Sequence, residues 1–449
     1  MHKDRLAAVE KGEVAFGVIS PMFRFLHRIY VAVFRQYPVL GRMAVVALVA
    51  EILFASVNNY ALSFYVLDDL KQSGRTLGIL ASTFLAVEML LKLPFGHLSD
   101  RYGRRLFASA GLALCLITPT VICAVPLDVF LVTPVLILLV LVPLRALDGV
   151  GAAALWPPLF AGVPDHVPRE QRGVGMSVVN TAYLAGLALG PTLAGLAMRL
   201  AASRGASGEW VSKAPFVLAA AAALIAALVA RTLPESRARR VEEAGVSGGV
   251  MPPVGLLVVV LVISFGEMFA VGTLAPYMAP YIKEVSGLAR SDVGVLLLLL
   301  FVPAGILGIP VGHMIDRWPR NRVVQAAMAT AAAGLWMVPA CRSVVTLLAV
   351  GAVVMLGFLF GLPAWLALVA DLAPEGRRGR MMGMMATAQG AGAFLGPLLG
   401  GVLWDVNIRY PWYAAAAILT IAAGAAACCL RGGRRGRAGT AGEVQVGRA

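Results

Sequence analysis

Six charged side chains lie inside stretches of the sequence that are otherwise almost entirely apolar. They are Glu51, Glu88, Lys92, Arg145, Asp148 and Glu267. An apolar cavity favours the protonated form of a carboxylate and a nearby cation favours the ionised form, so such a carboxylate can bind and release a proton as its surroundings change. These residue types indicate proton transfer or recognition of a charged small molecule. The sequence shows no catalytic motif with a nucleophile and its base.

The composition decides what surrounds these charges. Of the 449 residues, 59% are hydrophobic and only 14% are charged, whereas an average soluble domain has about 25% charged residues. The chain therefore lacks the polar residues to cover its surface in water, and a soluble enzyme is excluded. Five cysteines and five histidines are scattered, which predicts neither disulfides nor a metal site. No catalytic residue and no cofactor is expected.

Apolar runs between charged residues or Pro/Gly breaks predict twelve membrane-spanning helices at about 20 residues each. The runs are 43–67, 77–98, 105–125, 130–160, 173–198, 214–231, 254–280, 292–314, 322–340, 344–369, 381–404 and 411–430. The predicted fold class is thus an all-α integral membrane protein.

Basic residues predict the orientation of these spans. With the N-terminus inside, 27 of the 38 Lys and Arg residues fall on the cytoplasmic side, as the positive-inside rule requires. We therefore expect a multi-pass protein of the plasma (inner) membrane with both termini cytoplasmic. The net charge of +14 then reflects topology and contact with anionic lipids, so nucleic-acid binding is not needed to explain it.

The same runs divide the chain into five parts. These are a basic N-terminal segment (1–42), a six-helix bundle (43–231), a cytoplasmic loop (232–253), a second six-helix bundle (254–430) and a disordered basic tail (431–449). Within the first part, residues 22–35 have the pattern of a helix lying in the membrane interface; a basic disordered arm is the alternative.

The two bundles repeat each other in sequence. Residues 96–105 match 312–321, residues 165–176 match 371–382, and residues 186–195 match 392–401. Two parallel six-span repeats are typical of transporters.

Three motifs in the first half carry a resemblance to a known family. The loop signature G-x-L-x-D-R-x-G-R-[KR] is matched without departure by Gly96, Leu98, Asp100, Arg101, Gly103, Arg104 and Arg105. The fourth-span pattern R-x-x-[QD]-G-x-G is matched by Arg145, Asp148, Gly149 and Gly151. The fifth-span pattern G-x-x-x-G-P-x-x-[GA]-G is matched by Gly186, Gly190, Pro191, Ala194 and Gly195. On these motifs the chain resembles the major facilitator superfamily, and within it the twelve-span drug:proton antiporters.

The resemblance implies two six-helix halves related by a pseudo-two-fold axis, working by alternating access. We expect Gly96 to let two helix ends approach closely. We expect Asp100, Arg101 and Arg104 to form a charge cluster that latches the cytoplasmic ends of the two halves together in one state. The resemblance implies that Asp100 stabilises the outward-open form. A weaker second copy is Gly312, Asp316 and Arg317, with Pro319 where Gly103 stands. The alternative is that these charges only anchor the loop inside.

The glycine–proline runs of the fifth and eleventh spans predict close helix packing with a bend at each proline. Their members are Gly186, Gly190, Pro191 and Gly195 in the first half and Gly396, Pro397 and Gly401 in the second. An antiporter-specific role and a packing role alone are both open.

Arg145 and Asp148 are not repeated, since Gly351 and Val354 stand at their places in the second half. A charge at the centre of a spanning helix costs about 2.5–3.5 kcal/mol on insertion scales, so the six charges must face a cavity or one another. We expect Glu51 or Glu88 to carry the proton, with Arg145, Asp148 and Lys92 tuning it. Glu88 and Lys92, four residues apart, could instead neutralise each other.

The expected substrate cavity is rich in aromatic residues and has few polar ones. Its candidate residues are Asn58, Asn59, Tyr60, Tyr65, Trp156, Asn180, Tyr183, Glu267, Phe269, Tyr277, Trp365 and Gln389. Glu267 could contact a cationic group of the substrate or make a structural hydrogen bond.

This composition suits an amphipathic molecule better than a sugar. We therefore expect a monomeric secondary transporter that exports a small amphipathic molecule in exchange for protons. The alternatives are nutrient uptake or facilitated diffusion, and a membrane sensor that does not transport.

Overall fold

The computed structural model describes residues 36–132, 134–168, 171–236, 252–302, 318–373 and 378–429. Eleven helices in this part are long and apolar enough to cross a membrane. The predicted eighth span, 292–314, is helical over 290–302, and its remaining residues lie outside the described part. So do the predicted interfacial helix at 22–35, most of the central loop, and the tail 431–449.

The first half consists of six spans. They are α3 (Pro38–Ser56) with η1 (Val57–Ala61), α4 (Leu62–Phe64) and η2 (Tyr65–Asp69); α5 (Gly74–Tyr102); α6 (Arg104–Cys115) with α7 (Ile117–Ala124); α9 (Pro134–His166); α10 (Arg172–Ser203); and α11 (Gly208–Arg231). A short helix, α8 (Leu127–Val132), precedes α9. The second half contains α12 (Val254–Ser286), the helical residues 290–302, α14 (Arg320–Met337), α15 (Val344–Leu372), α16 (Arg378–Val406) and α17 (Tyr410–Cys429).

The helices are longer than the apolar runs that predict them. The first span begins at Pro38, so the predicted boundary between 42 and 43 is wrong and falls inside α3. The α12 helix has 33 residues, whereas about 20 suffice to cross the hydrocarbon core. Polar helix ends that extend past the core carry no hydropathy signal, which explains the difference.

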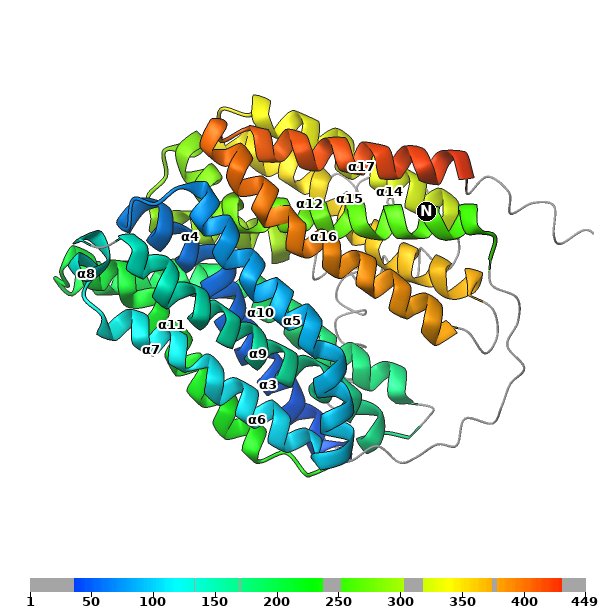
Figure 1. Ribbon diagram of the computed structural model, residues 1–449, viewed down its shortest axis with the longest axis horizontal. Coiled ribbons are helices and arrows are strands. Elements are labelled where there is room, and N and C mark those ends of the chain that lie inside the picture. Colours follow the sequence, from blue (N-terminus) through cyan, green and yellow to red (C-terminus); the bar gives the residue numbers. More distant parts are fainter. Residues whose placement is uncertain are drawn as a thin grey trace, which may run out of the picture.

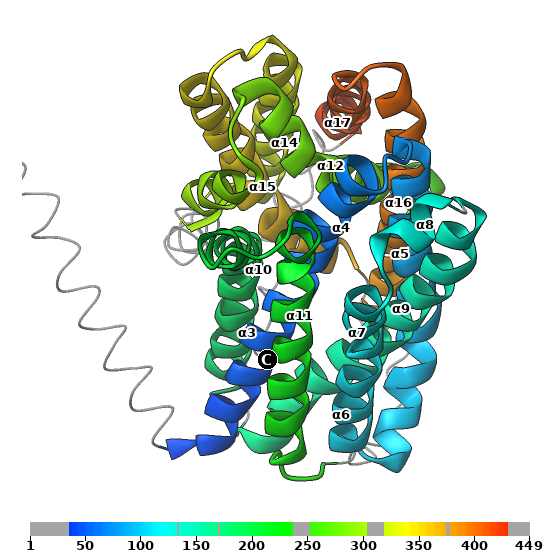
Figure 2. The ribbon, with the colours of Figure 1, turned by 90° about the vertical axis from the view of Figure 1, so that its left-hand side faces the viewer.

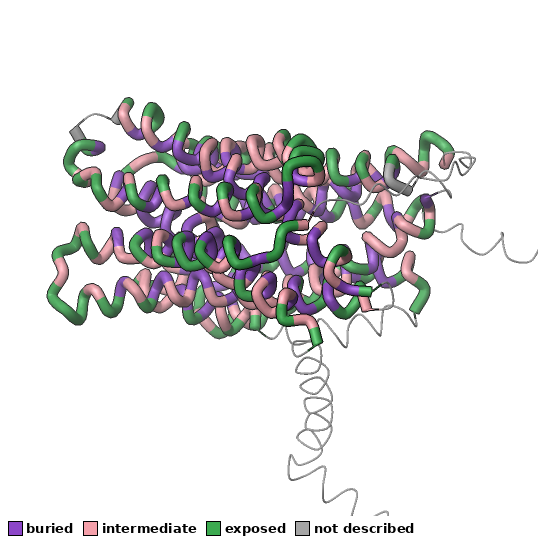
Figure 3. The backbone as a smooth tube through the Cα atoms, turned by 90° about the horizontal axis from the view of Figure 1, so that it is seen from below, coloured by how far each residue is buried: buried purple, intermediate pink, exposed green. Residues whose placement is uncertain are grey.

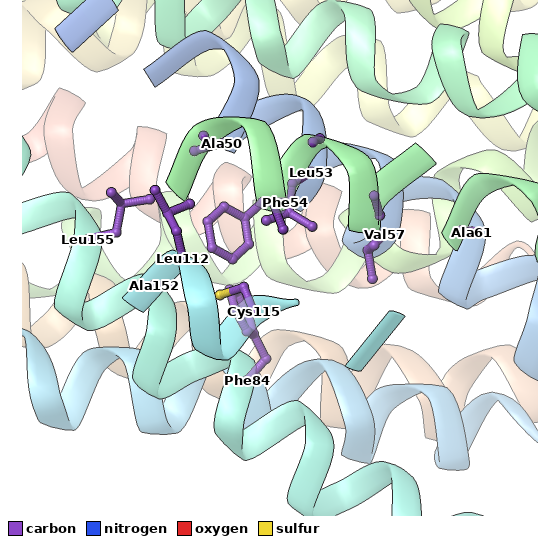
Figure 4. Close-up of a cluster of buried hydrophobic side chains, with 14 of the residues drawn as sticks. Ala50, Leu53, Phe54, Val57, Ala61, Phe84, Leu112, Cys115, Ala152 and Leu155 are labelled. Atoms are coloured by element: carbon purple, nitrogen blue, oxygen red, sulfur yellow. The ribbon is translucent and has the colours of Figure 1, made fainter. Parts of the chain in front are cut away.

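The two halves pack in the same way (Figures 1 and 2). In the first half α3 packs against α10 and α11, and α9 packs against α5 and α6. In the second half α12 packs against α16 and α17, and α14 packs against α15 and α17. Each half has buried apolar clusters of its own, so purple stretches run through both bundles in Figure 3. In the first half, Phe54 lies beside Phe84 with ring centroids 5.9 Å apart (Figure 4).

Glycines let α10 and α16 approach their neighbours closely, as the sequence predicts. A Cβ atom added at Gly186 would lie 2.7 Å from the Cβ of Glu51 on α3. One added at Gly396 would lie 2.6 Å from the carbonyl oxygen of Phe269 on α12. The glycine–proline runs therefore have a packing role in both halves. Both helices continue through their prolines.

The halves meet at one end of the bundle and diverge toward the other (Figure 1). We call the first the closed end; it holds the connections 70–73, 204–207 and 287–289. The other is the open end, which holds Gly103 and the start of α10. Along α5 and α16 the contact runs from Gly74 beside Gly401, at the closed end, to Met89 beside Gly390, near the middle of both helices. Between described residues, the hydrogen bonds and ion pairs that join the halves lie from the closed end to the middle.

Candidate functional site

Glu51 is a buried carboxylate in the first half. Only 6% of the residue is exposed, because α3 is pressed against α10 at Gly186. Its carboxylate has no hydrogen-bond partner within the described residues, and it lies within electrostatic range of Glu88 and Tyr183. An unpaired carboxylate at such a place is costly as an anion, so it is suited to change its protonation state.

Glu88, on α5, makes the ion pair that its spacing predicts. The Lys92 Nζ atom lies 2.8 Å from Glu88 Oε1, and the side chain of Lys92 is half exposed. Glu88 is thus neutralised locally, which the sequence left as one of two alternatives. Of the two carboxylates expected to carry a proton, Glu51 alone has no cation beside it within the described residues.

Arg145 and Asp148 form a buried ion pair on α9, with Arg145 Nη1 2.6 Å from Asp148 Oδ2. The guanidinium also donates to Asn58 Oδ1 and lies 4.7 Å from the centre of the Phe84 ring. Asn58 stands in η1, a π-helical stretch, and such stretches are frequent at functional sites. Arg145 therefore ties α9 to the first span and to α5. The predicted cavity residue Asn58 is bound to Arg145, so its carbonyl oxygen is already engaged.

An aromatic cluster lies next to these charges. The ring of Trp156 has its centroid 5.1 Å from Tyr183, 5.9 Å from Phe54 and 6.1 Å from Phe160. Of these four residues, Trp156 and Tyr183 are among the predicted cavity residues, whereas Phe54 and Phe160 are not. The spacing of four between Trp156 and Phe160 places both on one face of α9, and this is the signal by which the cluster could have been found. Tyr183 lies within electrostatic range of Glu51.

The second half contributes Glu267 on α12, of which 2% is exposed. Within the described part its Oε2 atom has no hydrogen-bond partner. One turn before it, Ser264 accepts a hydrogen bond of 3.0 Å from Trp365 Nε1. Trp365 is fully buried in the core between α12 and α15, so it supports this wall from within. Phe269, 8% exposed, stacks on Phe265 with centroids 5.5 Å apart.

The other predicted cavity residues are dispersed. Asn59 on η1 and Gln389 on α16 are half-buried, and Asn180 on α10 is exposed. These polar groups and Glu267 do not form one hydrogen-bonded cluster in the described part of the chain. The described geometry therefore concentrates the buried charges and aromatic rings in the first half.

The charge cluster expected to latch the two halves together lies entirely within the first half. Arg104 Nη2 lies 2.9 Å from Asp100 Oδ1, and Arg104 Nη1 lies 2.8 Å from Asp165 Oδ2 at the end of α9. Arg101 is exposed and lies 5.4 Å from the Tyr102 ring centre. The cluster thus joins α5, α6 and α9 rather than the two halves. Gly312, Asp316 and Arg317, the predicted second copy, lie outside the described residues.

Two glycines of this loop behave differently. The expectation that Gly96 brings two helix ends together is not met among the described residues in this conformation, because a Cβ atom there would meet none of them within 4 Å. Gly103 has a φ of +114°, which disfavours other residues, and an added Cβ would collide with the Glu235 carboxylate. Glu235 accepts a 3.1 Å hydrogen bond from the Arg105 backbone N–H at the start of α6, where a carboxylate is favoured. Glu235 is not among the site residues predicted from the sequence.

Lys213 directly precedes the predicted span 214–231, and that boundary is wrong because α11 begins at Gly208. Lys213 lies inside α11, is 2% exposed, and donates to Glu209 Oε1 at 2.6 Å and to the Val125 carbonyl oxygen at 2.8 Å.

The closed end also holds ion pairs that join the two halves, and local spacing in the sequence could not indicate them. They are Asp68 and Asp69 with Lys283 and Arg290, Arg199 with Asp292, and Arg75 with Asp405.

Comparison with known proteins identifies the family. The sequence model of the Major Facilitator Superfamily matches residues 44–263 and 260–448. The chain is 24% identical over 371 residues to Multidrug resistance protein 2 of Bacillus subtilis (strain 168), covering 78% of this chain and 86% of that protein. It is 27% identical over 370 residues to the Gentisate transporter of Corynebacterium glutamicum, covering 78% of each.

The fold is shared with solved transporters. The inward open conformation of the xylose transporter XylE from E. coli superposes with a TM-score of 0.68 at 14% identity, covering 87% of this chain and 95% of that chain. At this identity the likeness concerns the fold alone. The predicted family, its resemblance to the drug-efflux branch and the predicted fold class are confirmed.

Proposed function

The chain belongs to the Major Facilitator Superfamily of membrane transporters, and on that premise we propose that it exports a small amphipathic molecule in exchange for protons. The observation that carries the proposal is the environment of Glu51. Its buried carboxylate has no partner within the described residues, and it lies within electrostatic range of Tyr183, whose ring packs in the aromatic cluster with Phe54, Trp156 and Phe160. A proton and a cationic amphiphile would compete for such a carboxylate.

The aromatic cluster supports an amphipathic substrate. Aromatic faces offer a large apolar contact and attract cations, whereas a sugar needs many hydrogen-bonding groups. Few polar side chains accompany the cluster, and Asn58 is already engaged by Arg145. The relative named Multidrug resistance protein 2 agrees with this substrate class, while the relative named Gentisate transporter keeps an aromatic metabolite as the second candidate.

The orientation of the chain also belongs to the proposal. With both termini cytoplasmic in the inner membrane, as the basic residues predict, the closed end faces outward and the open end faces the cytoplasm. The described structure then corresponds to an inward-open state, in which the latch of Asp100, Arg104 and Asp165 is separated from the other half. We propose that the protein works as a monomer in contact with anionic lipids, driven by the proton gradient without a cofactor.

Proton release by the purified protein tests the proposal. Tetraphenylphosphonium added at fixed pH in detergent should displace protons from the wild type, and Glu51→Gln should abolish this release while the protein still folds. Asp128→Asn, which changes an exposed carboxylate in the first turn of α8, serves as the matched control and should release protons like the wild type. If tetraphenylphosphonium binds but releases no protons from the wild type, facilitated diffusion replaces exchange. If no compound binds or moves, the sensor alternative gains.

A further inference from the structure

A charged network joins the two halves at the closed end, and the mechanism proposed above does not use it. Asp68 Oδ2 lies 2.8 Å from Lys283 Nζ and 2.9 Å from Arg290 Nε, and Asp69 Oδ1 lies 2.8 Å from Arg290 Nη1. The two carboxylates end the first span, whereas Lys283 belongs to α12 and Arg290 to the helix that follows it. One element of the first half therefore holds two elements of the second.

Hydrogen bonds one and two turns back along the first span strengthen this junction. Proline lacks a backbone N–H, so Pro280 leaves the carbonyl oxygen of Pro276 in α12 without its helical partner. Ser63 Oγ, fully buried in α4, donates to this oxygen at 2.6 Å. Tyr60 donates to the carbonyl oxygen of Arg290. These bonds fix the first span against α12 with polar groups that would otherwise be unsatisfied inside the protein.

The network differs in solvent exposure from the two other ion pairs that join the halves within the described residues. Its four side chains are 11–28% exposed. In contrast, the side chain of Arg75, paired with Asp405, is 61% exposed, and that of Arg199, paired with Asp292, is 52% exposed. Exposed single pairs contribute little because water and salt screen them. Shielded charges that share partners interact more strongly, and separating the halves would leave each charge without its counterpart.

We propose that Asp68, Asp69, Lys283 and Arg290 form an ion-pair lock that holds the closed end shut and sets the resting conformation of the protein. The lock favours the state in which the opposite end is open. Breaking it raises the population of the state in which the closed end separates, because the network exists in only one of the two states. The consequence for transport rests on the proposed function, whereas the lock itself does not.

Spin-label distances test the lock in detergent without any substrate, so failure of the lock is distinguishable from failure of proton exchange. Labels on cysteines introduced at the exposed positions Arg204 and Arg342 report the separation of the halves at the closed end, in a protein whose five native cysteines are replaced by alanine. The unmodified lock should give mainly one short distance. Asp68→Lys and Lys283→Asp should each raise the ratio of long to short distances about tenfold, the equivalent of about 1.4 kcal/mol.

The double variant decides the interpretation. Asp68→Lys combined with Lys283→Asp rebuilds this one pair with reversed charges. The introduced lysine then faces Asp69 but also Arg290, whose Nε atom lies 2.9 Å from Asp68 Oδ2 in the wild type, so part of the short-distance population should return. Arg199→Ala, which breaks an exposed pair between the same halves, should change the ratio by less than about threefold. The proposal is overturned if the double variant is as open as the single ones, if the single variants leave the distances unchanged, or if Arg199→Ala opens the closed end equally.

Discussion

The two halves share their backbone contacts but differ in what those contacts surround. Gly186 on α10 packs between the Leu48 carbonyl and the Ile52 N–H of α3, and Gly392 on α16 packs between Phe265 and Phe269 of α12 in the same manner. By this equivalence Glu51 of the first half corresponds to Met268 of the second. The shared architecture thus requires a glycine at this contact in both halves, but it does not require a carboxylate beside the glycine.

A second pair of places shows the same difference. Arg145 lies over the Phe84 ring in the first half. In the second half Gly351 stands at the place of Arg145, and a Cβ atom there would lie 2.9 Å from the side chain of Leu300. At this place the second half therefore packs through an apolar contact, whereas the first half packs a charged side chain against a ring. At these two places the repeated architecture therefore does not require a buried charge.

Removing Arg145 should have the largest effect of the substitutions that test this difference between the halves. Arg145→Leu leaves the buried Asp148 without its cation, and loss of one partner of a buried pair costs about 3–5 kcal/mol. We expect a clear loss of thermal stability in detergent together with loss of transport. Arg145→Leu combined with Asp148→Leu should recover most of the stability but not the transport. Recovery of transport as well would show that the pair is only structural.

Adding a methyl group at the two equivalent glycines should harm both halves alike. In Gly186→Ala and Gly392→Ala the new Cβ atom collides with the facing helix, and overpacking of this kind costs about 1–3 kcal/mol. Thermal unfolding in detergent measures the effect, and Gly424→Ala, where a Cβ would meet nothing within 4 Å, is the control. If only Gly186→Ala impaired transport at equal stability, the fifth-span run would have an antiporter role beyond packing.

Glu51→Met makes the first half resemble the second at one place. The substitution removes a buried carboxylate and keeps an apolar side chain of similar length, so we expect folding close to that of the wild type. Proton-driven transport of tetraphenylphosphonium in vesicles should fall at least about tenfold, which corresponds to about 1.4 kcal/mol. The conservative variant Glu51→Asp should retain part of it. Unchanged coupling in Glu51→Met would move the proton site elsewhere.

Phe84→Leu should have the smallest effect, because it copies the apolar contact at Leu300. It removes the interaction of the Arg145 guanidinium with the ring, which is worth about 0.5–2 kcal/mol, and leaves the ion pair to Asp148 intact. We expect a small loss of thermal stability and nearly unchanged transport. A loss as large as that in Arg145→Leu would mean that Phe84 holds the guanidinium in place.

The sequence predicted those parts of the structure that depend on local spacing. Apolar runs located the helices, and the spacing of four indicated the pair Glu88–Lys92 as one of two alternatives. Contacts between distant spans were not predictable in this way. Asn58 meets Arg145 across 87 residues and Asp68 meets Lys283 across 215, and such pairings depend on how helices cross, which no periodicity records. For the same reason the closed-end charges could be interpreted only as topology.

Lys213 has a consequence for how the protein is made. Its ammonium group donates to the carbonyl oxygens of Cys123, in the last turn of α7, and of Val125, which follows that helix. Glu209 beside it accepts a hydrogen bond from the N–H of Leu127 at the start of α8. These backbone groups belong to chain synthesised about 90 residues earlier, and unsatisfied backbone groups near the membrane are costly. We therefore expect the connection between the third and fourth spans to reach its final structure only after the sixth span is inserted.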